Sequence, residues 1–236
     1  MAIDRYNYPS FPGFADVRLF RERLDLKVGD EAPDFTGNVL ETGSIMLSQL
    51  MDLAHVVLEF GSITSPQFCA GVPELEALRA EFEPKGFRFF VVYTRECHPA
   101  ENYPQHSSYE DKMRCANACR ELEHVTTPII VDALDGEIHQ MYGSLPNMCY
   151  VINKRGRIYY RSQWAAHDEL KDVLNDLVHM DEEVQKRGSE LPDGRFFYSE
   201  RLQVHNTDQE ARQRVFDRAG QRAHQDWSDL FARRRQ

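Results

Sequence analysis

The sequence lacks any long apolar run. No segment of its 236 residues approaches the roughly 20 apolar residues that a membrane-spanning helix needs, so no membrane span is predicted. The first residues, MAIDRYNYPSFPGF, also lack the charged and apolar regions of a secretory signal peptide. A cytoplasmic location is the expectation that follows.

Excess positive charge and paired cysteines are also missing. The formal net charge is −10, which disfavours binding to nucleic acid or to anionic membranes. The five cysteines are an odd number without C-x-x-C spacing, so neither a disulfide framework nor a zinc finger is indicated. Cys115 and Cys119 lie four residues apart, but a metal would need a further ligand from elsewhere. No metal and no cofactor are predicted.

What the chain does contain is an alternation of buried strands and helices. Apolar runs predict strands at residues 55–60, 87–93 and 127–132, and a hairpin at residues 149–161. Helical spacing and capping signals predict helices at residues 65–84, 107–123 and 165–180. This order predicts an α/β fold in which helices flank a central mixed sheet.

Two extensions flank this domain, which we place at residues 29–180. Residues 1–28 predict an N-terminal arm that lies on a surface, and residues 181–206 are polar and predicted to be irregular. From Thr207 one helix is predicted, with an apolar stripe formed by Ala211, Val215, Ala219, Ala223, Trp227, Leu230 and Phe231. Residues 181–236 are thus predicted to be a linker and a C-terminal helix. Because an exposed stripe of this length risks aggregation, the helix is predicted to pack across a two-fold axis in a homodimer. Packing on the same chain is the alternative.

The segment GSITSPQFC, residues 61–69, follows a predicted strand and opens a predicted helix. Free N–H groups and the helix dipole would surround Ser65 there. A thiol at that position would be activated, whereas a serine hydroxyl needs an adjacent base; capping of the helix is the other reading of Ser65. Cys69 shares its helix face and is the leading thiol, with simple burial as the alternative.

A series of motifs, in order, resembles the iodothyronine deiodinases. FGSITSPQF resembles the active-site loop of that family, and FVVYTRECHP resembles its second strand with a Glu-x-His-Pro ending. PQHSSYEDKMRCA resembles the segment that leads into its next helix, and VDALDGEIHQMYGSLPNMCYVINKRGRIYYR its third strand and hairpin. GDEAPDF also resembles the opening of peroxiredoxins. The resemblance covers about residues 29–180 and implies a thioredoxin-like fold.

The resemblance also implies roles for individual residues. Ser65 takes the position of the nucleophile, where the family has selenocysteine or cysteine, and Ser62 and Thr64 are its loop neighbours. Glu96 and His98 match the acid/base and proton-relay pair. The implied catalytic set is thus Ser65, His98 and Glu96, with Cys69 added from the reading of the helix.

Two further residues would contact the substrate. His106 matches a histidine that contacts a substrate phenol, and Pro146 stands near the cis-proline of thioredoxin folds. Together with Ser62 and Thr64, these residues form the expected binding set for a small molecule.

Departures from the family pattern shape the expected function. Ser65 lacks a redox-active atom, Ile63 stands where some members have a cysteine, and Trp164 falls where the hormone enzymes carry a substrate-binding arginine. Thyroid hormone is therefore not the expected substrate. A cysteine at position 65 would predict a thiol-based reductase or reductive dehalogenase that uses a thiol reductant. With serine, the alternative is a non-redox binding protein or an acid/base pocket built from the same carboxylate and histidines.

Overall fold

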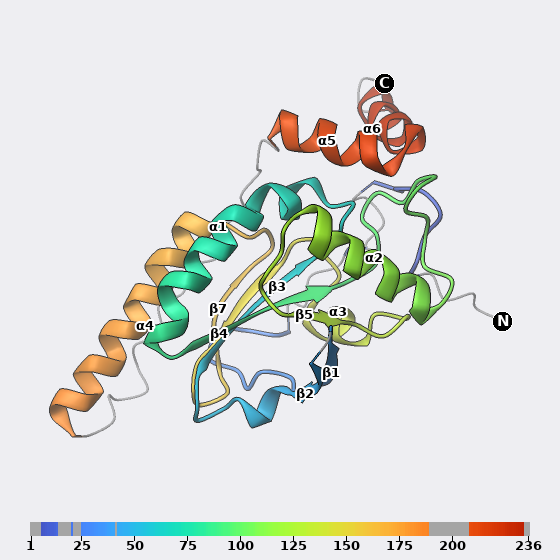
Figure 1. Ribbon diagram of the computed structural model, residues 1–236. Helices are drawn as coiled ribbons and strands as arrows, with labels where there is room; N and C mark the ends of the chain where they lie inside the picture. The colour runs from blue at the N-terminus through green and yellow to red at the C-terminus, as the bar shows by residue number, and fades with distance from the viewer. Residues whose placement is uncertain (1–5, 14–19, 21–24, 41, 189–207, 234–236) are drawn as a thin grey trace.

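The computed structural model describes residues 6–13, 20, 25–40, 42–188 and 208–233 (Figure 1). Seven strands form one sheet in the order β2-β1-β5-β4-β3-β6-β7. The strands are β1 (Thr36–Val39), β2 (Gly43–Met46), β3 (His55–Gly61), β4 (Phe87–Tyr93), β5 (Ile129–Val131), β6 (Cys149–Ile152) and β7 (Ile158–Ser162). The helices are α1 (Pro66–Phe82), α2 (Tyr109–Leu122), α3 (Glu137–Tyr142), α4 (His167–Arg187), α5 (Gln209–Ala219) and α6 (Gln221–Arg233), with short 3-10 turns η1 (Leu47–Gln49) and η2 (Glu83–Lys85).

The sheet is mixed, as the order of elements predicts. β3, β4 and β5 run parallel to one another, while β1, β2, β6 and β7 pair with their neighbours in antiparallel fashion. Parallel strands are joined by helical crossovers, so β3 leads into α1, and the ends of β3 and β4 meet at the same edge of the sheet. The predicted site residues belong to the loops at this edge.

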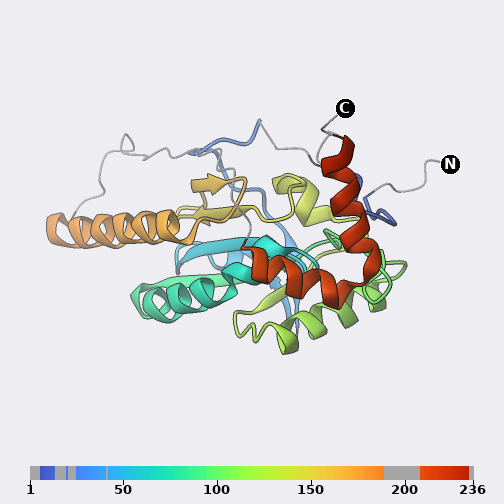
Figure 2. The same cartoon turned by 90° about the horizontal axis from the view of Figure 1, so that it is seen from above.

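Apolar side chains cover both faces of the central strands. In β3, Val57 packs in the cluster that α1, α2 and α4 cover, whereas Val56 and Leu58 point into the cluster on the opposite face. Seen from above, α1 and α2 lie on one side of the sheet and α3 lies on the other (Figure 2). Helices on both faces explain why β3 is buried along its whole length.

The strands β1 and β2 and the helix α3 were not predicted from the sequence, and α4 is longer than predicted. β1, β2 and α3 are short and carry little periodic signal. α4 continues to Arg187, so the expectation that the chain is irregular from residue 181 was wrong; the rest of that stretch, residues 189–207, lies outside the described residues. Among the described helices, none has the length and apolar character needed to cross a membrane.

The C-terminal segment forms two helices rather than one. Gly220 separates α5 from α6 with φ 129°, a backbone conformation that side chains disfavour. Val215, Ala219 and Ala223 are buried in the same core as α1 and α2. The stripe therefore packs on its own chain, and its proposed packing across a two-fold axis was wrong. The side chain of Phe231 lies outside the described residues, and the homodimer stays a prediction without this support.

A buried ion pair ties α4 to the sheet beneath α1. The Glu59 carboxylate, on β3, lies 2.9 Å from Nε2 of His167, and Nδ2 of Asn147 donates to its other oxygen at 3.1 Å. The imidazole lies so close to α1 that a Cβ atom on Gly71 would come within 2.4 Å of Cε1. Glycine at this helix position thus makes room for the pair.

We expect this pair to stabilise the fold more at low pH than at high pH. Burial would lower the pKa of His167, but the charge and hydrogen bond of Glu59 outweigh it and raise the pKa. The stabilisation is therefore complete below the unfolded value of about 6.5 and is lost as the pH rises through the raised folded value. In urea unfolding, Glu59→Gln should lose more stability relative to wild type at pH 6 than at pH 9. The exposed Asp172→Asn is the control, and an equal loss at both pH values would contradict the expectation.

Candidate functional site

Ser65 lies at the start of α1 with an unused hydroxyl. It is the N-cap residue, with φ −95° and ψ 106°, but its side chain makes no capping hydrogen bond. The hydroxyl is fully buried and has no hydrogen-bond partner. The prediction that Ser65 stands at the N-terminus of the first core helix is confirmed, whereas the capping role for its side chain is wrong.

Glu96 is the centre of a buried hydrogen-bond network beside this loop. Its carboxylate accepts hydrogen bonds from the hydroxyl of Thr64 at 2.5 Å and the hydroxyl of Tyr93 at 2.6 Å, and Nε2 of His106 lies 3.0 Å away. Burial would raise the pKa of Glu96, but the histidine and the two hydroxyls together lower it. The carboxylate is therefore ionised at neutral pH.

The hydroxyls of Ser62 and Thr64 also hold this loop to the segment after β4. Oγ of Ser62 accepts from the backbone N–H of Cys97 at 3.2 Å, and Oγ1 of Thr64 accepts from the backbone N–H of His98 at 3.2 Å. The loops that follow β3 and β4 are thus joined side by side, which brings the predicted residues of both loops into one site.

His98 has different surroundings from those expected. Its ring is buried among Phe11, Phe216 and Trp227, with centroid distances of 4.2, 4.9 and 5.9 Å. Burial lowers the pKa of His98 to about 3, so the imidazole is neutral at physiological pH. The family resemblance paired His98 with Glu96, but the histidine bonded to Glu96 is His106.

Three buried polar atoms of this site have no partner. They are Oγ of Ser65, Nδ1 of His98 and Nδ1 of His106. Buried polar groups in folded proteins are nearly always hydrogen-bonded, so each exception needs an explanation. The three atoms belong to the loops after β3 and β4 that Thr64 and Glu96 join, and His106 alone among these residues is bonded to the ionised carboxylate.

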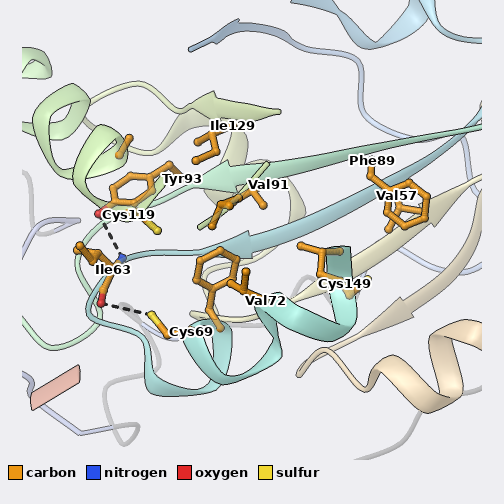
Figure 3. Close-up of a cluster of buried hydrophobic side chains, with 14 of the residues drawn as sticks. Val57, Ile63, Cys69, Val72, Phe89, Val91, Tyr93, Cys119, Ile129 and Cys149 are labelled. Atoms are coloured by element: carbon orange, nitrogen blue, oxygen red, sulfur yellow. Dashed lines mark hydrogen bonds between the residues drawn. The ribbon is translucent and has the colours of Figure 1, made fainter. Parts of the chain in front are cut away.

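Cys69 is not arranged as a reactive thiol. Its sulfur points back at the loop, 3.4 Å from the carbonyl oxygen of Ile63, while the backbone N–H of Ile63 donates a hydrogen bond to the hydroxyl oxygen of Tyr93 (Figure 3). Burial raises the pKa of the Cys69 thiol. The geometry therefore favours the alternative role of a buried side chain.

Cys115 and Tyr93 are members of the site that the sequence analysis missed. Sγ of Cys115, on α2, lies within 4.8 Å of ligand atoms of both Glu96 and His106. Carboxylate, imidazole and thiolate are ligand types that zinc accepts. Both oxygens of Glu96, however, already accept hydrogen bonds from hydroxyl groups. The hydrogen-bonded arrangement is therefore better suited to proton transfer than to metal binding. Burial raises the pKa of Cys115 to about 12, which leaves its thiol neutral.

Pro146 lies outside this network. It is buried in the loop before β6, and its neighbour Asn147 bonds Glu59 rather than a member of the site. Among the described residues there is no cis peptide bond. A direct role of Pro146 in substrate binding stays a prediction.

With the geometry established, comparison with known proteins identifies the family. A sequence model described as iodothyronine deiodinase matches residues 16–177. The chain belongs to the iodothyronine deiodinase family. Over 175 residues it is 28% identical to the thyroxine 5-deiodinase of Gallus gallus, a match that covers 69% of this chain and 66% of that protein. It is also 31% identical to the type II iodothyronine deiodinase of Aquarana catesbeiana, covering 63% of this chain and 64% of the relative.

The fold of this deiodinase-family chain is thioredoxin-like. An uncharacterized conserved protein from Geobacillus kaustophilus superimposes with a TM-score of 0.54, at 19% identity, over 73% of this chain and 89% of its own. A putative thiol:disulfide interchange protein DsbE from Chlorobium tepidum gives 0.52, at 18% identity, over 65% and 99%. The family match ends at residue 177, so α5 and α6 lie outside the matched segment. The chain thus spans about two thirds of the curated relatives that it matches.

Proposed function

We propose that this site binds a small phenol and moves a proton to or from it through Glu96 and His106, and that reduction of the bound molecule needs a thiol at position 65. The observation that carries the proposal is that His106, which is bonded to the ionised Glu96, keeps an unpartnered buried nitrogen, and that Ser65 and His98 on the adjoining loops also hold unpartnered polar atoms. A phenolic oxygen both donates and accepts hydrogen bonds, so it can satisfy such atoms.

Serine at position 65 limits the chemistry of the chain as encoded. A serine hydroxyl attacks only when a base is hydrogen-bonded to it, and Oγ of Ser65 has no such partner. Binding and proton transfer therefore remain for the encoded protein, which is the non-redox alternative raised by the sequence. This reading is favoured over a serine hydrolase because neither histidine of the site bonds the serine.

With cysteine at position 65, the reaction would be reductive dehalogenation. The thiolate attacks the halogen of an aryl halide, the carbon–halogen bond breaks, and the ring carbon receives a proton from the His106–Glu96 pair. A small thiol then displaces halide from the sulfur to form a mixed disulfide, and a second thiol releases the cysteine. In sum, one aryl halide and two thiols give the arene, a disulfide, halide and a proton.

A cavity of about 440 Å³ lies next to Cys115. Its lining contains Asn102, Tyr103, Arg114, Cys115, Ala118 and Arg218. Both arginines are already paired with carboxylates, Arg114 with Asp111 and Arg218 with Glu123, so they do not select an anionic ligand. Cys115 lies between this cavity and the Glu96–His106 pair.

The proposal predicts that the wild-type protein binds a halogenated phenol. Isothermal titration with tribromophenol should give a saturable one-site isotherm, and His106→Phe should weaken the affinity about tenfold because a hydrogen bond to the ligand is lost. His179→Phe, on α4 and away from the site, is the matched control. Absence of binding to the wild type, or equal affinity of both variants, would count against the proposal. The cytoplasmic location and the thiol reductant stay predictions from the sequence.

A further inference from the structure

The proposed site is closed by parts of the chain that are distant in sequence. Ser65 is fully buried, and the side chains of Glu96 and His106 are inaccessible to solvent. The ring of His98 is covered by Phe216 of α5 and Trp227 of α6. Phe11, from the N-terminal segment, also packs against this ring. In Figures 1 and 2, α5 and α6 lie over the end of the sheet at which α1 begins.

The cover is held by apolar side chains of α5 and α6, which pack in the same core as α1 and α2, and by polar contacts at its edge. Glu123, at the end of α2, is 7% exposed and forms ion pairs with Arg214 and Arg218 of α5. Arg218 also donates to the carbonyl oxygen of Ile63 at 3.1 Å and lies 3.8 Å from the sulfur of Cys69. One carboxylate thus fixes two arginines of α5, and one of these arginines reaches the loop that carries residue 65.

The joint between the two helices is fixed by a second set of contacts. The backbone N–H of Asn102 donates to the carbonyl oxygen of Ala219 at 3.0 Å, and its side chain donates to that of Arg218 at 2.9 Å. A Cβ atom on Gly220 would lie 2.0 Å from a carboxylate oxygen of Glu101. The loop after β4 therefore holds the α5–α6 joint, which places Phe216 and Trp227 over His98.

We propose that the pair α5–α6 is a lid of this chain over the family site, latched by Glu123, and that it must open to admit a substrate. Unpartnered polar atoms lie beneath it, so a ligand has groups to bind there but no open path to them in the closed form. Phe216 and Trp227 then form the apolar wall that encloses the bound ring. The lid lies outside the segment matched by the family model, so it distinguishes this chain from the matched domain.

This proposal deepens the function proposed above, because it states how a substrate reaches the site. Its test needs no turnover and no ligand, because Cys69 is a natural reporter. The thiol is 1% exposed beneath Arg218 of α5, so opening of the lid should expose it. Cys149, on β6 and fully buried, reports global unfolding instead. A lid that opens around a site that binds no phenol would leave this proposal standing and remove the other.

The experiment labels the full-length protein with N-ethylmaleimide and follows each cysteine by peptide mass spectrometry. Glu123→Gln removes the latch and should raise the labelling rate of Cys69 about tenfold or more, since loss of one partner of a buried pair is strongly unfavourable. The rate at Cys149 should not change. Glu121→Gln, an exposed carboxylate on the same helix, is the matched control and should label like wild type.

A second variant keeps the test decisive if Glu123→Gln folds poorly. Arg214→Gln removes only the half-exposed arginine of the latch and should raise Cys69 labelling about two- to threefold, as expected for a partly exposed pair. An unchanged Cys69 rate in both variants would overturn the lid. A parallel rise at Cys69 and Cys149 would also overturn it, because exposure would then come from unfolding of the whole domain.

Discussion

Ser65→Cys is expected to give the protein a thiol-dependent reductase activity that the encoded chain lacks. Sulfur can form a bond to a halogen or a peroxide oxygen and be released again by a second thiol, whereas a hydroxyl cannot complete that cycle. The side chain of Ser65 makes no capping hydrogen bond at the start of α1, and the partial positive charge of a helix N-terminus stabilises a thiolate placed there. We expect the pKa of this thiol to lie below its ordinary value of about 8.5.

Burial raises the pKa of a thiol and so opposes the lowering expected from the helix N-terminus. Measurement of the pKa at position 65 shows which of the two effects is larger. Burial raises the pKa of Cys97, in the neighbouring loop, to about 12, so the helix N-terminus must outweigh the same effect at position 65. With a dithiol reductant and a panel of peroxides and halogenated phenols, the variant should react about a hundredfold faster than the background rate, which wild type should not exceed; this factor is within the range that a positioned acid or base contributes.

A matched variant separates position from the mere presence of a thiol. Ser62→Cys places a cysteine three residues earlier in the same loop, where the hydroxyl now accepts a bond from Cys97 and lies outside the helix start. Ser62→Cys should show little turnover. The pH dependence of its alkylation rate should give a thiol pKa of about 8.5 or higher. If both cysteine variants behave alike, the loop does not activate its occupant, and the redox part of the proposed function fails.

The central part of the fold was predictable because its signals are local. β3 and β4 are continuous apolar runs, and Ser108 precedes α2 as its N-cap, where its side chain accepts a hydrogen bond from the N–H of Asp111. Parallel strands have their carboxyl ends at the same edge of a sheet, so the residues that follow β3 and β4 could be placed together from the sequence alone. Thr64 and Glu96 do meet there.

The surroundings of that site were not predictable because they depend on distant pairings. Phe11 and Trp227 are 216 positions apart in the numbering, yet both contact the ring of His98. Nothing near His98 in the sequence encodes either partner. The apolar stripe on α5 and α6 was identified correctly. Periodicity shows which face of a helix is buried, but not whether that face packs on the same chain or on a second subunit. Tyr93 was missed for a related reason, since its strand pattern indicates core packing while its hydroxyl bonds Glu96.

Replacement of Glu96 is expected to cost more stability than any other single change considered for this protein. Its carboxylate accepts from Thr64 and Tyr93 and faces Nε2 of His106, all in the dry interior. In Glu96→Gln, one oxygen becomes an NH₂ group that meets these donors, so at least one buried hydrogen is left without an acceptor. A buried group left without a hydrogen-bond partner costs about 1–3 kcal/mol, and more where a charged group is involved, so we expect a loss of unfolding free energy of about 3 kcal/mol at pH 7.

The pH dependence of this loss identifies its electrostatic origin. Burial alone would raise the pKa of Glu96, but its donors lower the folded value, so the wild-type stabilisation is complete above the unfolded value of about 4.3 and is lost as the pH falls through the folded value. The gap between wild type and Glu96→Gln in urea unfolding should therefore be constant from pH 6 to 7 and shrink below about pH 4. Glu121→Gln should stay within about 0.5 kcal/mol of wild type throughout, as exposed substitutions do. If Glu96→Gln also differs from wild type by only about 0.5 kcal/mol in unfolding free energy at pH 7, the network does not hold the two loops together.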